Sequence, residues 1–264
     1  MSIPFAVPTS GGASPTRRER ARAATIAEIK QTALQLMKET GTTDLRFTDI
    51  AREMGMTAPA LYRYFADSEA LLTELIVDAY DDLGTAVADA RDAIPAEQLW
   101  DRLLAVSQAY RTWARNEPQR FALILGMPVP GYCAPDGGPT TEAAKRAMGQ
   151  LQTHFFDAAR LSVLREPLIT EVDDALVECL RDNEGHDLVL PGVDSDLGDR
   201  ISRLGFGSFT PQHFQAMLNT WASLHGFTSL EAYGHLDWLS PEARDALFIT
   251  GVRLAARTAG LPEH

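Results

Sequence analysis

The residues best suited to chemistry in this chain lie close together between positions 57 and 64. A threonine, two alanines and a proline come first, and Tyr62, Arg63 and Tyr64 follow them. Hydroxyl and guanidinium groups can donate hydrogen bonds to phosphate oxygens, and small side chains let a helix sit deep in a major groove of DNA. The pattern suits nucleic-acid recognition, and an ordinary surface hairpin of two helices fits it equally well.

Residue types that serve catalysis or metal binding are present, but their spacing does not suit either role. The six histidines include no pair in H-x-x-x-H or H-E-x-x-H spacing, so the sequence contains no recognisable zinc site. His225 is interpreted as a hydrogen-bonded core residue, with a ligand role as the alternative. Cys133 lies in a stretch rich in proline and glycine and is expected to be inert, with redox sensing as the alternative. We therefore expect neither an enzyme nor a bound cofactor or metal.

Two short helices joined by a turn would position the residues between 57 and 64. Apolar residues recur at helical spacing from Phe47 to Met54, which predicts one buried helix face. Gly55 supplies the backbone freedom that a sharp turn needs. Thr57 is predicted to cap the second helix, on which Leu61 and Phe65 would point back to the first. The other residues of this second helix are then left on its outer side.

At these fixed spacings, the chain resembles the DNA-binding domain of the tetracycline-repressor (TetR) family of bacterial regulators. The resemblance is carried by Gly41, Ile50, Ala51, Gly55, Thr57, Leu61, Tyr62, Tyr64, Phe65 and Leu71. It implies an N-terminal three-helix domain of the helix-turn-helix type that binds double-stranded DNA. The residues expected to contact DNA are Arg46, Thr48, Thr57, Ala58, Pro59, Ala60, Tyr62, Arg63 and Tyr64.

Two positions depart from the pattern of that family. Arg46 stands where the family usually has a threonine or serine that caps the second helix, so the cap could pass to Asp44. Ser68 stands where the family often has a lysine that touches phosphate, and it is predicted to cap the next helix instead, with Glu69 at the positive helix end. These departures concern individual phosphate contacts and leave the expected fold unchanged.

Composition and charge bound the remaining possibilities. The chain has 264 residues, of which 45% are hydrophobic, and no apolar run long enough to cross a membrane. Its two cysteines cannot build a disulfide framework, so a reducing cytoplasm is expected. Residues 1–16 are expected to be a disordered tail. The net charge is −12, yet residues 1–65 carry nine basic and six acidic side chains, so a mildly basic head precedes an acidic body.

Helical periodicity without any strand signal predicts an all-α fold. The expected domains are a DNA-binding domain over 17–80 and a helical regulatory and dimerisation domain over 81–264. Before the first helix stand four arginines, which form either a basic arm that contacts DNA or a plain charged tail, namely Arg17, Arg18, Arg20 and Arg22. The expected helices cover residues 23–40, 47–54, 57–65, 68–91, 96–116, 120–125, 140–164, 167–181, 211–225, 230–237 and 240–258.

The body shows a second resemblance, to a TetR-family regulatory domain type named for its Trp-His-Gly motif. It is carried by Tyr110, Trp113, Ala114, Pro118, Phe121, Trp221, His225 and Gly226. This resemblance implies a helical bundle that senses a small molecule and forms a homodimer through helices 211–225 and 240–258. The candidate ligand-binding residues, for which a plain core is the alternative, are Trp100, Tyr110, Trp113, Phe121, Met127, Phe155 and Phe156.

The sequence thus predicts a cytoplasmic, homodimeric transcription regulator that is not attached to a membrane. The resemblance implies a repressor that binds a palindromic operator and is released by a small-molecule effector of unknown identity. The alternative is a helical ligand-binding protein without specific DNA binding.

Overall fold

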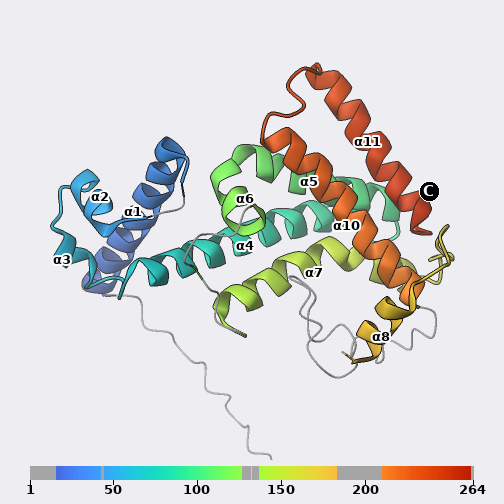
Figure 1. Ribbon diagram of the computed structural model, residues 1–264, viewed down its shortest axis with the longest axis horizontal. Coiled ribbons are helices and arrows are strands. Elements are labelled where there is room, and N and C mark those ends of the chain that lie inside the picture. Colours follow the sequence, from blue (N-terminus) through green and yellow to red (C-terminus); the bar gives the residue numbers. More distant parts are fainter. Residues whose placement is uncertain (1–15, 43–44, 127–131, 133–136, 183–209, 263–264) are drawn as a thin grey trace, which may run out of the picture. The chain divides into compact units, whose positions relative to one another are not determined.

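The computed structural model describes residues 16–42, 45–126, 132, 137–182 and 210–262. All regular secondary structure in these ranges is helical (Figure 1), which confirms the expected all-α fold. The chain divides into two compact units, residues 1–68 and residues 69–264. The boundary expected between residues 80 and 81 falls inside helix α4 (Ser68–Asp92). The expected tail over 1–16 lies outside the described residues except for Thr16.

The first unit, which we call the head, begins with the long helix α1 (Arg17–Thr40). Thr16 caps it in a capping box: the Glu19 backbone N–H donates to Thr16 Oγ1 at 3.2 Å, and the Thr16 backbone N–H donates to the Glu19 carboxylate at 2.7 Å. Hydrogen bonding of its carboxylate to Thr16, first to the backbone N–H and then to the side chain, holds the pKa of Glu19 below its ordinary value. The helix therefore starts six residues before the expected residue 23, and the four arginines expected in a flexible arm lie in its first turns.

Helices α2 (Phe47–Glu53) and α3 (Ala58–Leu61) complete the head. Between them, Gly55 has a φ of 64°, the left-handed conformation that favours glycine, so the predicted turn is confirmed. The Gly41 backbone, with a φ of 67°, ends α1 by donating to the Met37 carbonyl at 2.9 Å. The core of the head consists of side chains that are all buried, namely Ile29, Ala33, Met37, Phe47, Ile50, Ala51, Leu61 and Phe65.

The predicted helix caps in the head differ from the observed ones. Thr57 occupies the N-cap of α3 and Arg46 that of α2, but neither side chain makes a capping hydrogen bond. Asp44, the alternative cap for α2, lies outside the described residues. Ser68 is the first residue inside α4, so it does not take the cap position expected for it. Tertiary burial of Leu61 holds the four-residue α3 in place without a side-chain cap.

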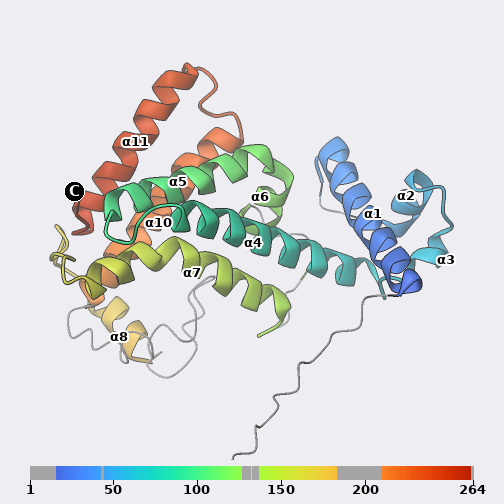
Figure 2. The same cartoon turned by 180° about the vertical axis from the view of Figure 1, so that it is seen from behind.

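The second unit, the body, contains the remaining helices (Figures 1 and 2). Helix α5 lies at its centre and packs against α6, α7, α10 and α11. Gly84 of α4 comes close to α7, because a Cβ at this glycine would lie 3.2 Å from the Ala147 Cα. The bounds after α4 are α5 (Leu99–Asn116), α6 (Pro118–Leu125), α7 (Pro139–Arg160), α8 (Asp174–Asp182), α10 (Pro211–Ala232) and α11 (Pro241–Thr258).

One apolar core joins α5, α7, α10 and α11. Its fully or nearly fully buried members are Leu99, Leu103, Phe155, Ala158, Phe214, Met217, Phe248, Val252 and Ala256. Because these residues come from both ends of the body sequence, the two C-terminal helices are fixed to the centre of the body. Ser240 caps α11 as predicted, accepting a bond of 3.2 Å from the Ala243 backbone N–H.

Four expected helix ranges in the body are wrong. Helix α10 runs without a break from Pro211 to Ala232, whereas a break after residue 225 and a separate helix over 230–237 were expected. Gly226 costs this helix only about 1 kcal/mol relative to alanine, and burial of Phe214 and Met217 on the same helix outweighs that cost. Helices α7 and α8 are shorter than expected, since α7 ends at Arg160 and α8 starts at Asp174. The expected connection over 184–207 lies outside the described residues.

Candidate nucleic-acid interface

The short helix α3 and the turn after it place polar and aromatic side chains on the surface of the head. Tyr62 is 58% exposed and Arg63 is exposed, while the adjacent Leu61 is fully buried. Tyr64 is half-buried. Of the other expected contact residues, Arg46, Thr48, Thr57 and Pro59 are exposed, and Ala58 and Ala60 are half-buried. Every expected DNA-contacting side chain is therefore at least partly accessible.

A ring contact connects the start of α2 with the end of α3. The rings of Phe47 and Tyr62 have centroids 5.0 Å apart and planes inclined by 59°. Because Arg46 and Thr48 flank Phe47 in the chain, this contact brings the backbone at the N-terminus of α2 close to Tyr62. The two groups of expected contact residues thus belong to one region of the head.

Arg22 braces this region from α1. Its guanidinium group donates to the Arg63 backbone carbonyl at 2.9 Å and lies 5.2 Å from the centre of the Tyr64 ring. The sequence analysis placed Arg22 in a basic arm, and that expectation is wrong for this residue. The reason is that α1 extends six residues further toward the N-terminus than its apolar periodicity indicates, so Arg22 lies on a rigid helix beside α3.

In the body, the aromatic residues expected to line a pocket mostly fill the core. Tyr110 is fully buried and its hydroxyl shares a 2.9 Å hydrogen bond with His225 Nδ1. The Trp113 indole N–H donates to Asp82 on α4 at 2.9 Å. Phe121 is fully buried between the rings of Tyr110 and His225. The polar atoms of Tyr110 and Trp113 thus link helices, and a ligand-binding role for these residues stays a prediction.

A cavity of ≈ 320 Å³ lies instead between α5, α7, α10 and α11. Among the expected ligand-binding residues, only Phe155 lines it. Trp100 and Phe156 are half-buried against the core beside it, and the Arg253 guanidinium lies 5.5 Å from the centre of the Trp100 ring. Met127 lies outside the described residues.

The sequence analysis missed a buried ionic network that joins α5, α10 and α11. The Arg111 guanidinium donates to both carboxylate oxygens of Glu231, at 2.5 and 2.6 Å, and forms an ion pair with Asp245 at 2.8 Å. Burial, the largest single effect, raises the pKa of Glu231, but the hydrogen bonds from Arg111 and the charges of Arg111, Arg115 and Arg244 together outweigh it and hold that pKa below its ordinary value. The Arg111 guanidinium also lies 4.7 Å from the centre of the Phe248 ring. Charged residues far apart in sequence carry no periodic signal that would predict such a network.

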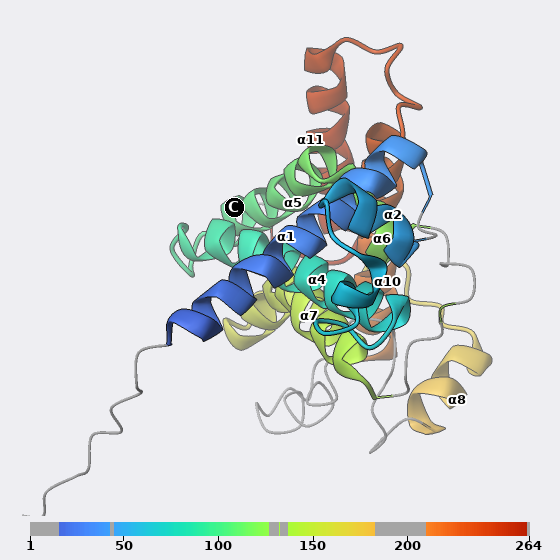
Figure 3. The same ribbon diagram turned by 90° about the vertical axis from the view of Figure 1, so that its left-hand side faces the viewer.

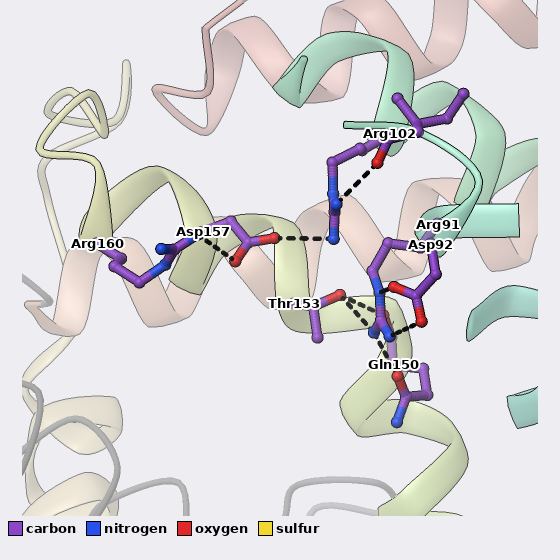
Figure 4. Close-up of polar contacts among 8 residues, drawn as sticks. Arg91, Asp92, Arg102, Gln150, Thr153, Asp157 and Arg160 are labelled. Atoms are coloured by element: carbon purple, nitrogen blue, oxygen red, sulfur yellow. Dashed lines mark hydrogen bonds and ion pairs between the residues drawn. The ribbon is translucent and has the colours of Figure 1, made fainter. Parts of the chain in front are cut away.

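A polar cleft of ≈ 490 Å³ lies between α4, α5 and α7, and Figure 4 shows polar contacts among its residues. Arg91 donates to Asp92 at 2.8 Å and also to the side chains of Gln150 and Thr153. Arg102 reaches the Ile94 carbonyl at 3.0 Å and Asp157 at 3.4 Å. These charges neutralise one another across the helices, which is the arrangement of a structural ion-pair network and not of an acid–base pair poised for catalysis.

His225 accords with its interpretation as a hydrogen-bonded core residue. It contacts Tyr110 through Nδ1 and Ser229 through Nε2, at 2.9 and 3.3 Å, and burial lowers its pKa. Within the described ranges, no group of three or more His, Cys, Asp or Glu side chains could hold a metal ion. No helix in the described part of the chain is both long and apolar enough to cross a membrane. Cys133 lies outside the described residues.

Two family models match the chain. The one described as "Bacterial regulatory proteins, tetR family" matches residues 29–75, and the one described as "Tetracyclin repressor-like, C-terminal domain" matches residues 103–255. The second match alone covers more than half of the chain. The chain belongs to the TetR family. Its assignment to the Trp-His-Gly type of regulatory domain stays a prediction.

Relatives of this TetR-family chain include an HTH-type transcriptional regulator of Mycobacterium bovis. It is 40% identical over 142 residues, which are 54% of this chain and 58% of the relative. An HTH-type transcriptional regulator of Mycobacterium tuberculosis matches with the same identity and coverage. The match therefore spans less than two thirds of the length of these relatives. The crystal structure of a candidate regulatory protein, SCO4313, is similar with a TM-score of 0.63 and 29% identity, covering 91% of this chain and 98% of that one.

Proposed function

We propose that this TetR-family protein is a cytoplasmic transcriptional repressor that binds a palindromic DNA operator as a homodimer and is released by a small-molecule effector. The observation that carries the proposal is the surface formed by α3 and the turn after it. There, Tyr62 and Arg63 are exposed directly beside the buried Leu61. A buried anchor next to exposed hydrogen-bond donors is what a recognition helix needs in order to hold its outward side chains in a fixed place against DNA.

The head supplies both kinds of contact that sequence-specific DNA binding requires. The small residues Ala58, Pro59 and Ala60 would face the bases and let α3 approach the floor of the major groove. Tyr62, Arg63, Tyr64 and Thr57 would reach bases or phosphates beside α3, and Arg46 and Thr48 would reach phosphates from the start of α2. The brace from Arg22 to the Arg63 carbonyl keeps this surface in register with α1.

A homodimer through α10 and α11 is supported by two exposed helix stripes that carry no charge. On α11 the exposed residues at helical spacing are Ala243, Ala246, Leu247, Thr250, Gly251 and Leu254. On α10 they are Asn219, Ala222, Ser223, Gly226 and Leu230. Helices α10 and α11 pack against each other (Figure 3). Depletion of charged residues on an exposed surface is typical of the centre of a protein–protein interface, and here the surrounding body is strongly acidic.

A dimer would also suit the size of the head. One recognition helix contacts only a few base pairs, whereas two heads about one helical turn of DNA apart, roughly 34 Å, read both halves of a palindrome. The effector would bind the body and favour a state in which the two heads no longer fit successive grooves. It can shift the protein between the two states only by its difference in affinity for them.

The test is to select bound fragments from a genomic DNA pool with the full-length protein and to measure their affinity at several salt concentrations. A palindromic consensus and a logarithm of affinity that falls linearly with the logarithm of salt are expected, because phosphate contacts release counterions. If no sequence is enriched and binding to every fragment is equally weak, the protein is a ligand-binding body without specific DNA binding. The titles of the mycobacterial relatives, which name HTH-type transcriptional regulators, support the first outcome.

A further inference from the structure

The cavity between α5, α7, α10 and α11 is free of formal charge. In a chain with 23% charged residues, all of its lining side chains are uncharged, and most are apolar, including Leu103, Phe155, Phe227 and Phe248. A bound carboxylate or ammonium group would find no partner of opposite charge here, and a buried unpaired charge is costly. The composition of the wall therefore selects against charged ligands.

Two polar side chains in this wall lack hydrogen-bond partners within the described part of the structure. His154 on α7 is only 8% exposed, and neither of its ring nitrogens is bonded. The indole N–H of Trp221 on α10 is buried and also unbonded. Buried polar atoms are satisfied in the great majority of cases, so two such groups in one cavity wall indicate hydrogen bonds that another molecule supplies.

The protonation of His154 restricts the kind of hydrogen bond it can make. Burial lowers the pKa of His154 to about 3, so the ring is neutral near pH 7 and offers one donor and one acceptor. Trp221 offers a donor only. Together they match an oxygen atom that accepts hydrogen bonds, or a hydroxyl group that both accepts and donates.

We infer that this cavity is the effector site and that it takes an uncharged, largely apolar molecule carrying a ketone or hydroxyl oxygen, which His154 and Trp221 bind. This inference rests on the proposed function, because it names the chemical class of the effector. The rest of the wall is mostly apolar, and its polar members Ser107, Gln152, Thr220, Ser223 and Thr250 are uncharged, so shape and the polar group of the ligand would decide which molecules bind.

The cavity opens on the face of α11 that we propose for the homodimer. Leu247 and Leu254 line the cavity and are 49% and 62% exposed, so they mark where it opens. Both lie on the uncharged stripe of α11 that we propose for the homodimer. A ligand that moves α11 against α10 would therefore alter the face on which the second copy packs, and with it the spacing of the two heads.

The first experiment compares three probes of equal chain length with the full-length protein by isothermal titration calorimetry at pH 8. These are dodecan-2-one, dodecan-2-ol and dodecanoate. The ketone and the alcohol are expected to bind at least about tenfold more tightly than the carboxylate, a difference of about 1.4 kcal/mol. Equal or tighter binding of dodecanoate would overturn the inference, as would the absence of binding by all three.

The second experiment uses variants of the cavity. His154→Phe keeps an aromatic ring of similar size but removes both nitrogens, and it is expected to weaken dodecan-2-one binding about three- to tenfold, the usual range for one lost hydrogen bond. Trp221→Phe should act in the same direction and serves if the first variant does not fold. Unchanged affinity in both would show that these groups do not bind the probe.

A blocking variant tests the location of the site. A Cβ added at Gly251 in the cavity wall meets nothing within 4 Å, so Gly251→Leu adds bulk at the mouth of the cavity without a backbone clash. Because Gly251 also lies on the exposed stripe of α11, sedimentation of the variant must show the same oligomeric state as the unchanged protein. Binding of dodecan-2-one should be lost. The matched control is Gly149→Leu on α7, where a Cβ also meets nothing within 4 Å but which does not line this cavity. Equal effects of the two variants would place the probe elsewhere.

Failure of the inference can be told apart from failure of the proposed function. Operator binding is measured without any probe, so a protein that selects a palindrome but does not bind dodecan-2-one retains its function as a DNA-binding regulator while the inference falls. If the protein binds the ketone through His154 but enriches no DNA sequence, the proposed function is contradicted. The inference about the ligand class of the cavity then still holds.

Discussion

Tyr62 is the residue on which the DNA-binding surface can be tested with the smallest change. Its hydroxyl lies on a side chain that is 58% exposed, while its ring packs against Phe47. Tyr62→Phe keeps the ring contact and removes one donor to DNA, so operator affinity should fall about two- to tenfold with no change in thermal unfolding. Fluorescence anisotropy with the selected operator measures this effect. The control is Tyr233→Phe in the body, which is 45% exposed and should leave affinity unchanged.

His154 should make the stability of the body depend on pH. The pKa of this histidine is about 3 in the folded chain and has its ordinary value of 6.5 when the chain is unfolded, so the unfolded state binds more protons between these values. The stabilisation is fully present above pH 6.5 and is lost as the pH falls. Between pH 7 and pH 5, wild type should lose about 2 kcal/mol of unfolding free energy relative to His154→Phe.

Urea denaturation of both proteins at several pH values measures this difference. All other titrating groups are shared by the two proteins, so their effects cancel in the comparison. A difference that stays constant from pH 7 to pH 5 would mean that His154 is accessible to protons in the folded chain, which would also remove the basis for treating it as a neutral hydrogen-bonding group.

At the scale of elements, the brace between α1 and α3 depends on Arg22. Arg22→Met removes the bond to the Arg63 carbonyl and the contact with the Tyr64 ring, which together are worth about 1 kcal/mol at an exposed site. Hydrogen exchange followed by mass spectrometry should show faster exchange over residues 57–65, with the body unaffected. Arg18→Met, on the same helix and also exposed, is the control. If residues 57–65 exchange at the same rate in both variants, Arg22 does not stabilise α3, and its expected role is limited to a phosphate contact.

The ionic network between α5, α10 and α11 leads to a prediction about paired replacement. Glu231→Leu leaves the Arg111 guanidinium buried with only Asp245 close by, and it should lower the unfolding free energy by about 3 kcal/mol. The double variant Arg111→Met with Glu231→Leu removes both buried charges and should be more stable than Glu231→Leu alone. Urea denaturation of the unchanged protein, Glu231→Leu and the double variant measures their unfolding free energies. A double variant less stable than Glu231→Leu would contradict the prediction.

Features formed by residues close together in the sequence were predictable, and contacts between residues far apart in the sequence were not. The turn at Gly55 and the buried anchors Leu61 and Phe65 are local features, and periodicity predicted them. The hydrogen bonds of Tyr110 and Trp113 were not predictable, because their partners, His225 and Asp82, lie 115 and 31 positions away and no local pattern reveals such bonds. The continuity of α10 through Gly226 also depends on tertiary packing that outweighs local propensity.

At the scale of the whole molecule, the homodimer depends on the uncharged stripe of α11. Leu254 is 62% exposed on this stripe, so Leu254→Glu should leave the monomer folded but place a charge among the apolar contacts of the interface, where its desolvation is costly. Sedimentation at micromolar concentration should show a monomer, and operator affinity should fall because only one half-site is held at a time. The control is Leu168→Glu, 74% exposed between α7 and α8, which should remain dimeric. A dimeric Leu254→Glu protein would place the interface on another face.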